Sequence, residues 1–273
     1  MTAAATPTAV ADYEIVRLLG EGNNGRFYLA RPPARLGLAE EHVVLKVFGD
    51  RVSEQAYERG VRELRAFASV KSPYLVRVFD AVLEDRFAYA MEYLPLGSLA
   101  SPAKQLDRAT VLGVLQDAAL AAHELHEAGL AHGDITPANV LLAEDGDRIG
   151  GRLSDLGLAR LLSPGNTLTG MGRASSVEYM DPDLLAGARP SRRTEIWALG
   201  ATVHRALSGA GLFGDLPDEQ PLLAIRKVLA SKAQVAEELP EADAALVADC
   251  LADGDARLAT AADVAARLAQ LSR

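Results

Sequence analysis

Short, mostly apolar runs rich in β-branched and aromatic residues occur within the first 92 positions of the chain and predict β-strands. Each run is bounded by glycine, proline or charged residues. The runs occupy residues 13–19, 26–30, 43–48, 75–83 and 87–92. A glycine-rich turn joins the first two runs and indicates a hairpin. Together the five runs predict one antiparallel sheet.

One helix is expected between the third and fourth runs. Residues 53–70 place Leu64 and Phe67 with other apolar residues at helical spacing, and Ser53 is a suitable N-cap. This pattern predicts a helix with one apolar face, which can cover the sheet.

The pattern changes at residues 94–98, where proline and glycine end the strands and helical spacing takes over. Two long helices are expected at residues 110–128 and 194–208, each ended by the glycine that follows. Thr260 and Asp263 form a capping-box pattern that opens a last helix. The second part of the chain is therefore predicted to be mostly helical.

These patterns divide the chain into three segments: a disordered leader at residues 1–11, a small lobe at 12–94 and a larger lobe at 95–273. We predict an α+β fold with two lobes, a small antiparallel sheet with one main helix and a larger, mostly helical part.

Composition restricts the partners and the compartment. The net charge of −9 and the lack of basic clusters argue against a nucleic-acid or anionic-membrane surface. The single Cys250 excludes an internal disulfide, and we expect it to be a small buried residue of a protein in a reducing compartment. No membrane span or signal peptide is apparent, so we expect a cytoplasmic location. The oligomeric state stays open.

Polar side chains gather in two turns of the second lobe. The segment AHGDITPANVLL contains Asp134 and Asn139 before an apolar strand, and Asp155 ends the next apolar stretch. Neighbouring strands would bring these groups to one spot, where they suit phosphoryl transfer with Mg²⁺. Each turn alone is equally typical of an ordinary Asx turn or β-turn. Their order and spacing carry the prediction.

The small lobe adds a candidate phosphate-binding pattern. Gly20, Gly22 and Gly25 match G-x-G-x-x-G, but a strand follows them, so they belong to a hairpin and not to a dinucleotide-binding turn. Lys46 interrupts an apolar strand and is either an edge lysine or a phosphate ligand. In the second case Glu63 is the expected carboxylate partner, with Glu58 as the competing candidate.

In this order the motifs resemble those of a protein-kinase catalytic domain of the eukaryotic Ser/Thr type, which is also widespread in bacteria. The resemblance covers residues 12–271 and includes the glycine loop, Lys46, Glu63, HGDITPAN, Asp-Leu-Gly at 155–157 and the segments 179–183 and 195–200. It implies an ATP- and Mg²⁺-dependent kinase that phosphorylates Ser or Thr of a protein substrate.

The resemblance also implies roles for individual residues. Asp134 would orient the acceptor hydroxyl, Asn139 and Asp155 would hold Mg²⁺, and Lys46, held by Glu63, would contact the ATP phosphates. His132 would be a packing residue. The remaining nucleotide contacts expected from the family are Gly20, Gly22, Gly25, Phe27, Val44, Met91, Glu92, Leu94 and Leu141.

Several residues depart from the family pattern. Gly133 replaces the usual arginine, Thr136 replaces a lysine near the transferred phosphate, and Phe27 and Val44 add bulk beside the adenine ring. Asp183 stands where the family pairs an acidic residue with an arginine, here Arg257.

These departures keep two alternatives open: a pseudokinase that serves as an interaction or regulatory module, and a small-molecule kinase similar to aminoglycoside phosphotransferases. The histidines at 42, 123, 126 and 204 are expected on the surface or on helix faces.

Overall fold

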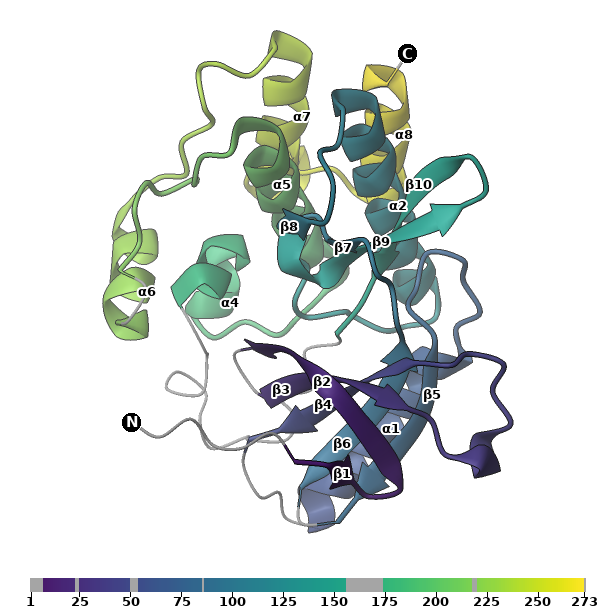
Figure 1. The fold of residues 1–273 in the computed structure, drawn as a ribbon. Coiled ribbons are helices and arrows are strands. Elements are labelled where there is room, and N and C mark those ends of the chain that lie inside the picture. The colour runs from purple at the N-terminus through teal and green to yellow at the C-terminus, as the bar shows by residue number, and fades with distance from the viewer. Residues whose placement is uncertain are drawn as a thin grey trace. The chain divides into compact units, whose positions relative to one another are not determined.

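The structure is a computed structural model that describes residues 7–22, 25–49, 54–84, 86–155, 174–217 and 220–272. The chain forms two compact units (Figure 1). The small unit holds the described residues up to 68 together with 76–93, and the large unit holds residues 69–75 and the described residues from 94 onward. The segment between the helix and the last two strands of the small unit thus belongs to the large unit.

The small unit is built on an antiparallel sheet, as the sequence predicts, with six strands where five were expected. The spatial order of its strands is β1-β2-β3-β4-β6-β5. Their bounds are Ala9–Val10 (β1), Tyr13–Gly22 (β2), Gly25–Arg31 (β3), Val43–Phe48 (β4), Val78–Leu83 (β5) and Phe87–Glu92 (β6). The predicted hairpin is confirmed, because β2 pairs with β3 up to Gly22 and Gly25.

The central strand β4 is buried on both faces, which explains its nearly continuous apolar sequence. Its alternate residues Val43, Leu45 and Val47 join the apolar cluster on one face of the sheet. The side chains between them, including Lys46 and Phe48, belong to the opposite face because side chains alternate along a strand. The charged Lys46 is therefore part of a buried face.

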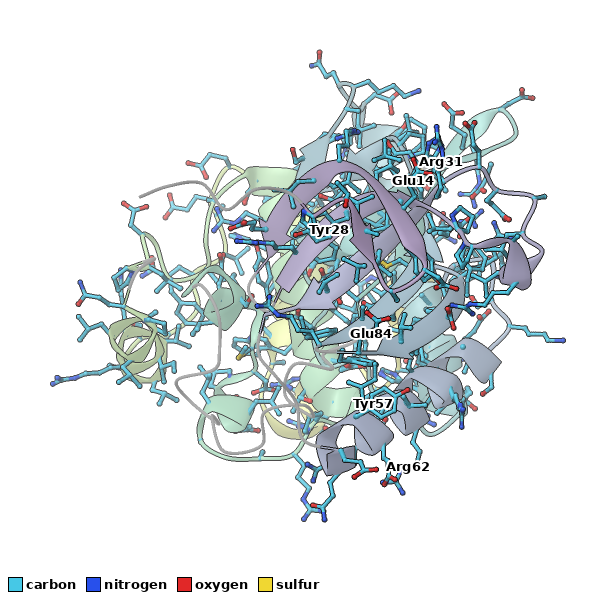
Figure 2. All side chains as sticks on the ribbon, turned by 60° about the horizontal axis from the view of Figure 1, so that its bottom comes forward. Glu14, Tyr28, Arg31, Tyr57, Arg62 and Glu84 are labelled. Atoms are coloured by element: carbon cyan, nitrogen blue, oxygen red, sulfur yellow. The ribbon has the colours of Figure 1, made fainter. Side chains whose placement is uncertain are left out.

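Helix α1 (Glu54–Ser69) buries the apolar positions predicted for it, with Leu64 and Phe67 nearly inaccessible. The ring of Tyr57 meets Phe87 of β6 edge to face, with 5.6 Å between ring centroids, while Arg62 points away from the sheet (Figure 2). The predicted N-cap Ser53 lies outside the described residues.

Two boundaries of the small unit differ from the prediction. Residues 9 and 10, expected in the disordered leader, form β1 and pair with β2. Strand β5 begins at Val78 instead of residue 75, because Leu75 forms a parallel bridge with Leu153 of the large unit. Tertiary pairing decides both boundaries, and a local pattern does not carry that information.

The large unit consists mainly of helices. Its helices are α2 (Arg108–Glu127), α4 (Pro182–Leu185), α5 (Arg192–Ser208), α6 (Pro221–Ala230), α7 (Glu241–Leu251) and α8 (Ala261–Leu271). Its strands are β7 (Gly97–Ser98), β8 (Ser101–Pro102), β9 (Val140–Asp145) and β10 (Arg148–Leu153), and its short 3-10 turns include η2 (Pro137–Asn139), η3 (Ala174–Tyr179) and η4 (Gly254–Ala256). One apolar cluster in this unit joins η3, α5 and α6. None of the described helices is long and apolar enough to cross a membrane.

Capping residues set the ends of the long helices. Asp107 caps α2 by accepting from the Thr110 N–H at 2.8 Å, and a capping box at Ser191 opens α5. Both helices therefore start two residues before the predicted positions. The predicted end of α5 at Gly209, with φ of 71°, and the capping box at Thr260 are confirmed.

The single cysteine is buried against α5, as expected. A Cβ added to Gly200 would lie 2.4 Å from the Cβ of Cys250, so the two helices α5 and α7 approach closely there. Burial raises the pKa of the Cys250 thiol to about 12, which keeps it protonated and unreactive at neutral pH.

Candidate functional site

Asp134 and Asn139 are held together in the loop between α2 and β9. The amide nitrogen of Asn139 donates to the backbone oxygen of Asp134 at 2.8 Å and to its carboxylate at 2.9 Å. Because the amide nitrogen of Asn139 donates to these two oxygens of Asp134, its amide oxygen is the atom left to coordinate a cation. Among the described residues this oxygen accepts no hydrogen bond.

The turn carrying Asp155 is joined to this loop by Ser154. Its N–H and its hydroxyl both donate to the backbone oxygen of Asn139, at 2.8 and 3.1 Å. The antiparallel strands β9 and β10 begin and end at these residues, so their pairing brings the two turns side by side. Asp155 adopts a left-handed backbone conformation with φ of 63°, which is unfavourable for a residue with a side chain and is typical of functional positions.

His132 links the same two turns from the interior. It is buried, its Nδ1 accepts from the Asp134 N–H at 3.3 Å, and its Nε2 lies 3.0 Å from the backbone oxygen of Ser154. A neutral imidazole with the proton on Nε2 can satisfy both bonds. Burial lowers the pKa of His132 and so favours this neutral form. The structure thus gives His132 a packing and hydrogen-bonding role.

Glu195 of α5 anchors the backbone of the same loop. Its carboxylate accepts from the Gly133 N–H at 2.5 Å and lies 2.7 Å from Nε2 of His126, and both side chains are nearly inaccessible, at 1% exposure for His126 and 4% for Glu195. Burial acts to raise the pKa of Glu195, but the bonds from His126 and Gly133 hold it below its ordinary value. Gly133, which replaces the usual arginine, has φ of 82°, a conformation that glycine adopts without strain.

His126 lies on helix α2, which is one of the two placements expected for it, and is buried and bonded to Glu195. One expectation about this region is corrected. Arg257 pairs with Asp181 and not with Asp183: its guanidinium forms a buried ion pair with Asp181, while Asp183 is exposed. The pairing is two residues away from the expected one, because Asp181 is buried beside Arg257. Asp181 also caps α4, by accepting from the Asp183 N–H at 2.9 Å.

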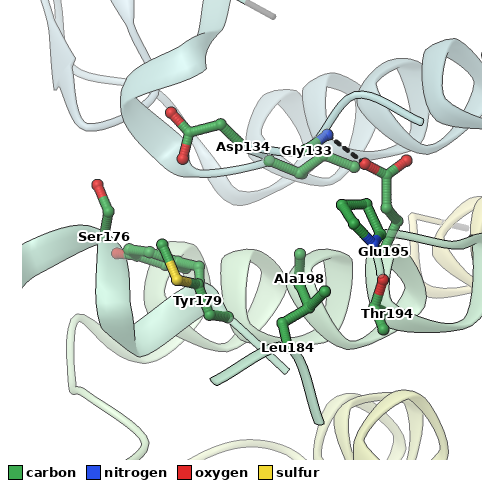
Figure 3. A pocket seen from close by; sticks show the side chains of 11 residues that line it. Gly133, Asp134, Ser176, Tyr179, Leu184, Thr194, Glu195 and Ala198 are labelled. Atoms are coloured by element: carbon green, nitrogen blue, oxygen red, sulfur yellow. Dashed lines mark hydrogen bonds between the residues drawn. The ribbon is translucent and has the colours of Figure 1, made fainter. Parts of the chain in front are cut away.

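A pocket lies beside Asp134 within the large unit (Figure 3). Gly133 and Asp134 lie along one side of it, and Ser176, Tyr179 and residues of α4 and α5 lie along the other. The lining combines a carboxylate and a hydroxyl with apolar groups such as Leu184, Met180 and Ala198. Sequence reasoning did not single out this pocket, because its walls come from segments that are more than forty residues apart.

In the small unit, Lys46 lies on β4 with 4% of its surface exposed. Its ammonium lies over two aromatic rings, 5.1 Å from the centroid of Phe27 and 5.0 Å from that of Phe48. Glu63, its expected carboxylate partner, is exposed on α1. Glu58, the competing candidate, is also exposed. The face of α1 that packs against the sheet carries Leu64 and Phe67 instead.

The other predicted nucleotide contacts occupy defined positions in their own units. Gly20 and Gly22 end β2, and Gly25 opens β3, where a Cβ would lie 2.2 Å from the backbone oxygen of Val47. Val44 and Met91 are directly paired on β4 and β6. Glu92 ends β6, Leu94 follows it, and Leu141 lies on β9. Leu156 and Gly157 lie outside the described residues.

The donor set of the large unit fits a hard divalent cation. Asp155 offers a carboxylate and Asn139 an amide oxygen, and oxygen ligands of this kind suit Mg²⁺ or Ca²⁺ better than Zn²⁺. Within the described part of the chain there is no cluster of three or more His, Cys, Asp or Glu side chains. A cation held here would therefore need ligands from a bound substrate as well, which is how Mg²⁺ binds together with phosphates.

Comparison with known proteins agrees with this arrangement. Over residues 13–267 the chain matches the family described as Protein kinase domain. It is 31% identical over 220 residues to the DNA damage-responsive serine/threonine-protein kinase RqkA of Deinococcus radiodurans, with 77% of this chain and 32% of that protein covered. It is 36% identical over 212 residues to the serine/threonine-protein kinase PknJ of Mycobacterium tuberculosis, with 74% and 35% covered.

The longest of these alignments includes nearly the whole chain. The serine/threonine-protein kinase PknK of Mycobacterium tuberculosis is 28% identical over 272 residues, which cover 96% of this chain and 24% of PknK. The chain thus spans only about a quarter to a third of the length of these relatives. Because the family match runs from the first long strand of the small unit into the last helix of the large unit, the chain belongs to the protein kinase family.

Proposed function

We propose that this protein transfers the γ-phosphate of ATP to Ser or Thr residues of a protein substrate in a reaction that requires Mg²⁺. Membership of the protein kinase family implies ATP and a divalent metal ion in general. The observation that carries the proposal is the bonding of Asn139, whose amide nitrogen fixes the Asp134 carboxylate and whose amide oxygen is left for a cation.

Asp134 is proposed to accept the proton of the substrate hydroxyl. Its carboxylate is only partly buried and lies along the pocket that the large unit offers to a substrate. The Asn139 amide and the backbone bond to His132 restrict its position, which supports its role in orienting the hydroxyl for attack.

Asn139 and Asp155 are proposed to bind Mg²⁺ through their side-chain oxygens. A bound metal ion would neutralise part of the negative charge of the phosphates. The two backbone bonds from Ser154 to Asn139 keep these two ligands in neighbouring turns, so the chain itself fixes their spacing.

The small unit is proposed to supply phosphate and adenine contacts. Lys46 carries the positive charge for the α and β phosphates, and the glycines of the β2–β3 hairpin leave room for phosphate oxygens near the backbone. The backbone of Glu92 and Leu94, together with Phe27, Val44, Met91 and Leu141, is proposed to contact the adenine. Glu63 remains the proposed catalytic partner of Lys46, with its side chain exposed in this structure.

The pocket beside Asp134 supports a polypeptide substrate. A side chain next to the acceptor Ser or Thr can enter between Gly133 on one side and Tyr179 and Leu184 on the other. Burial and the neighbouring Glu178 raise the pKa of Tyr179 to about 12, so its phenol stays neutral there. An apolar residue beside the acceptor suits such a lining.

The alternative of an interaction module without catalysis, which rests on departures such as Thr136, is not favoured, because the relatives are serine/threonine-protein kinases. Thr136 is buried in the position where the family has a lysine, so the described loop offers no cation beside Asp134 at this point. Fixed charges near the transferred phosphate contribute strongly to phosphoryl transfer. The proposed kinase is therefore expected to be slow but active.

The test is incubation with Mg²⁺-ATP and a general protein substrate, followed by intact-mass spectrometry. We expect added phosphate with the wild-type protein and at least a hundredfold slower transfer, roughly the contribution of a general base, with Asp134→Asn. Asp147→Asn is the matched control, because Asp147 is exposed in the β9–β10 turn of the same unit. Equal transfer by the wild type and Asp134→Asn, or none by the wild type, would contradict the proposal.

A further inference from the structure

Lys46 is surrounded by aromatic side chains on its face of the sheet. Phe27 of β3 is directly paired with Lys46 on one side, and Tyr89 of β6 is directly paired with it on the other. Phe48 is two residues further along β4 and therefore shares the face of Lys46. The ammonium lies 5.1 Å from the Phe27 centroid and 5.0 Å from the Phe48 centroid, within the range of cation–π attraction.

Further rings fix the position of Phe48. It stacks on Phe87 with 5.3 Å between centroids and an interplanar angle of 29°, and it lies 6.2 Å from the ring of Tyr89. Tyr57 of α1 meets the other edge of Phe87. Phe48 is therefore a buried ring that packs against two further rings, whereas Phe27 is half-buried.

This arrangement addresses a physical difficulty. Taking an ammonium out of water is costly unless nearby groups stabilise the charge. The face of an aromatic ring carries negative charge density and attracts a cation more strongly when water is excluded. Two such rings beside a lysine with 4% exposure both stabilise the charge and restrict where the ammonium can lie.

We infer that Phe27 and Phe48 are positioning residues that hold the ammonium of Lys46 in place to meet the phosphates of the nucleotide. Here the term aromatic clamp denotes these two residues. The inference rests on the proposed role of Lys46 in binding ATP. The inference also gives Phe27 a second role. Its ring adds bulk beside the adenine, and it stabilises the ammonium of Lys46.

Nuclear magnetic resonance tests the clamp without any nucleotide. The chain has five lysines, so protein with ¹³C-labelled lysine gives five sets of Cε–Hε signals, and Lys46→Arg identifies the one from Lys46. Ring currents should shift the Lys46 Hε signal upfield of the other four. Phe27→Leu and Phe48→Leu should each move it toward them.

The matched control is Phe79→Leu in the same sheet. Phe79 also lies under a cation, Arg77, at 5.3 Å, but on β5 and away from Lys46. This change should leave the Lys46 signal in place. A Lys46 signal among the other four in the wild type, or one that neither Phe27→Leu nor Phe48→Leu moves, would overturn the inference.

Binding measurements separate the clamp from a role of Phe27 at the adenine. Phe48, unlike Phe27, is not among the proposed adenine contacts. Phe48→Leu should weaken ATP binding about three- to tenfold, as expected for the loss of one desolvated cation–π contact, and should leave adenosine binding unchanged because adenosine has no phosphates. Phe48→Tyr, which keeps the ring, should restore ATP binding. Equal weakening for ATP and adenosine would overturn the inference, whereas a wild type that binds neither would refute the proposed function and leave the clamp to the resonance test.

Discussion

At the scale of single residues, buried histidines determine how the site is held together. His132 must be neutral to accept from Asp134 and donate to Ser154, and His126 must donate to the Glu195 carboxylate that anchors Gly133. Neither residue offers its ring to solvent. They act on catalysis through the loop that carries Asp134, and not by contact with a substrate.

Acid should destabilise the protein because of His132 and His204. Burial lowers the pKa of both in the folded state, while in the unfolded chain they bind a proton near 6.5. Below that pH the unfolded state holds more protons than the folded state, so the free energy of unfolding rises with pH and is lost as pH falls below 6.5. Each histidine contributes at most about 1.4 kcal/mol per pH unit.

Urea denaturation between pH 5 and 7.5 measures this slope. His204→Leu should reduce it, and His42→Gln should not, because His42 shows no such burial. A free energy of unfolding that is constant or increases toward pH 5 would contradict the assignment.

The His126–Glu195 contact gives a second prediction. His126→Leu removes the donor and leaves a buried carboxylate oxygen without it, so we expect a loss of about 1–3 kcal/mol in the free energy of unfolding. His123→Leu is the control, because it changes a residue of the same type three positions away on the same helix. It should lower the free energy of unfolding by less. Urea midpoints that are equal for the two variants would show that the contact contributes nothing.

At the scale of secondary-structure elements, close packing supports the strand of Lys46 in the small unit, and one ion pair supports the pocket of the large unit. Gly25 allows β3 to approach the backbone of β4 beside Lys46. The Asp181–Arg257 pair ties the start of α4, which lines the pocket, to the turn before α8. Each feature can be changed by a single substitution with a matched control.

Gly25→Ala should lower the melting temperature, because the added methyl would lie 2.2 Å from the Val47 oxygen and must push the strands apart. Overpacking of this kind costs about 1–3 kcal/mol. Gly20→Ala, where nothing lies within 4 Å of the added atom, should melt close to the wild type. A pair of variants with the same melting temperature would refute the close approach of β3 and β4.

Asp181→Asn should destabilise the large unit by about 3–5 kcal/mol, because it leaves the Arg257 guanidinium buried without its charge partner. Asparagine can still cap α4, so the loss reports the ion pair and not the cap. Asp183→Asn, at an exposed position, is expected to change the urea midpoint little. A larger destabilisation by Asp183→Asn than by Asp181→Asn would show that Arg257 pairs with Asp183, as the sequence suggested.

At the scale of the whole molecule, the sequence predicts what depends on local pattern and on motif order. Short β-rich runs joined by a glycine-rich turn predict the antiparallel sheet, Gly209 predicts the end of α5, and the order of Lys46, Asp134 and Asp155 identifies the family. These features need only neighbouring residues or their order along the chain.

Features that depend on tertiary contacts could not be predicted in this way. Glu63 is exposed because the packed face of α1 is set one position away, at Leu64. The partner of Arg257 and the burial of His126 depend on residues more than sixty positions distant. A sequence pattern carries no information about which of two nearby acidic residues turns inward.

The most direct test of the central claim is the Mg²⁺ dependence of γ-phosphate transfer by the wild type and by Asp155→Asn. If Asn139 and Asp155 hold the metal ion beside Asp134, the Mg²⁺ concentration needed for half-maximal transfer should rise at least about tenfold in Asp155→Asn, as expected when a charged ligand becomes neutral. Asp147→Asn should behave as the wild type. An unchanged Mg²⁺ requirement in Asp155→Asn would contradict the account.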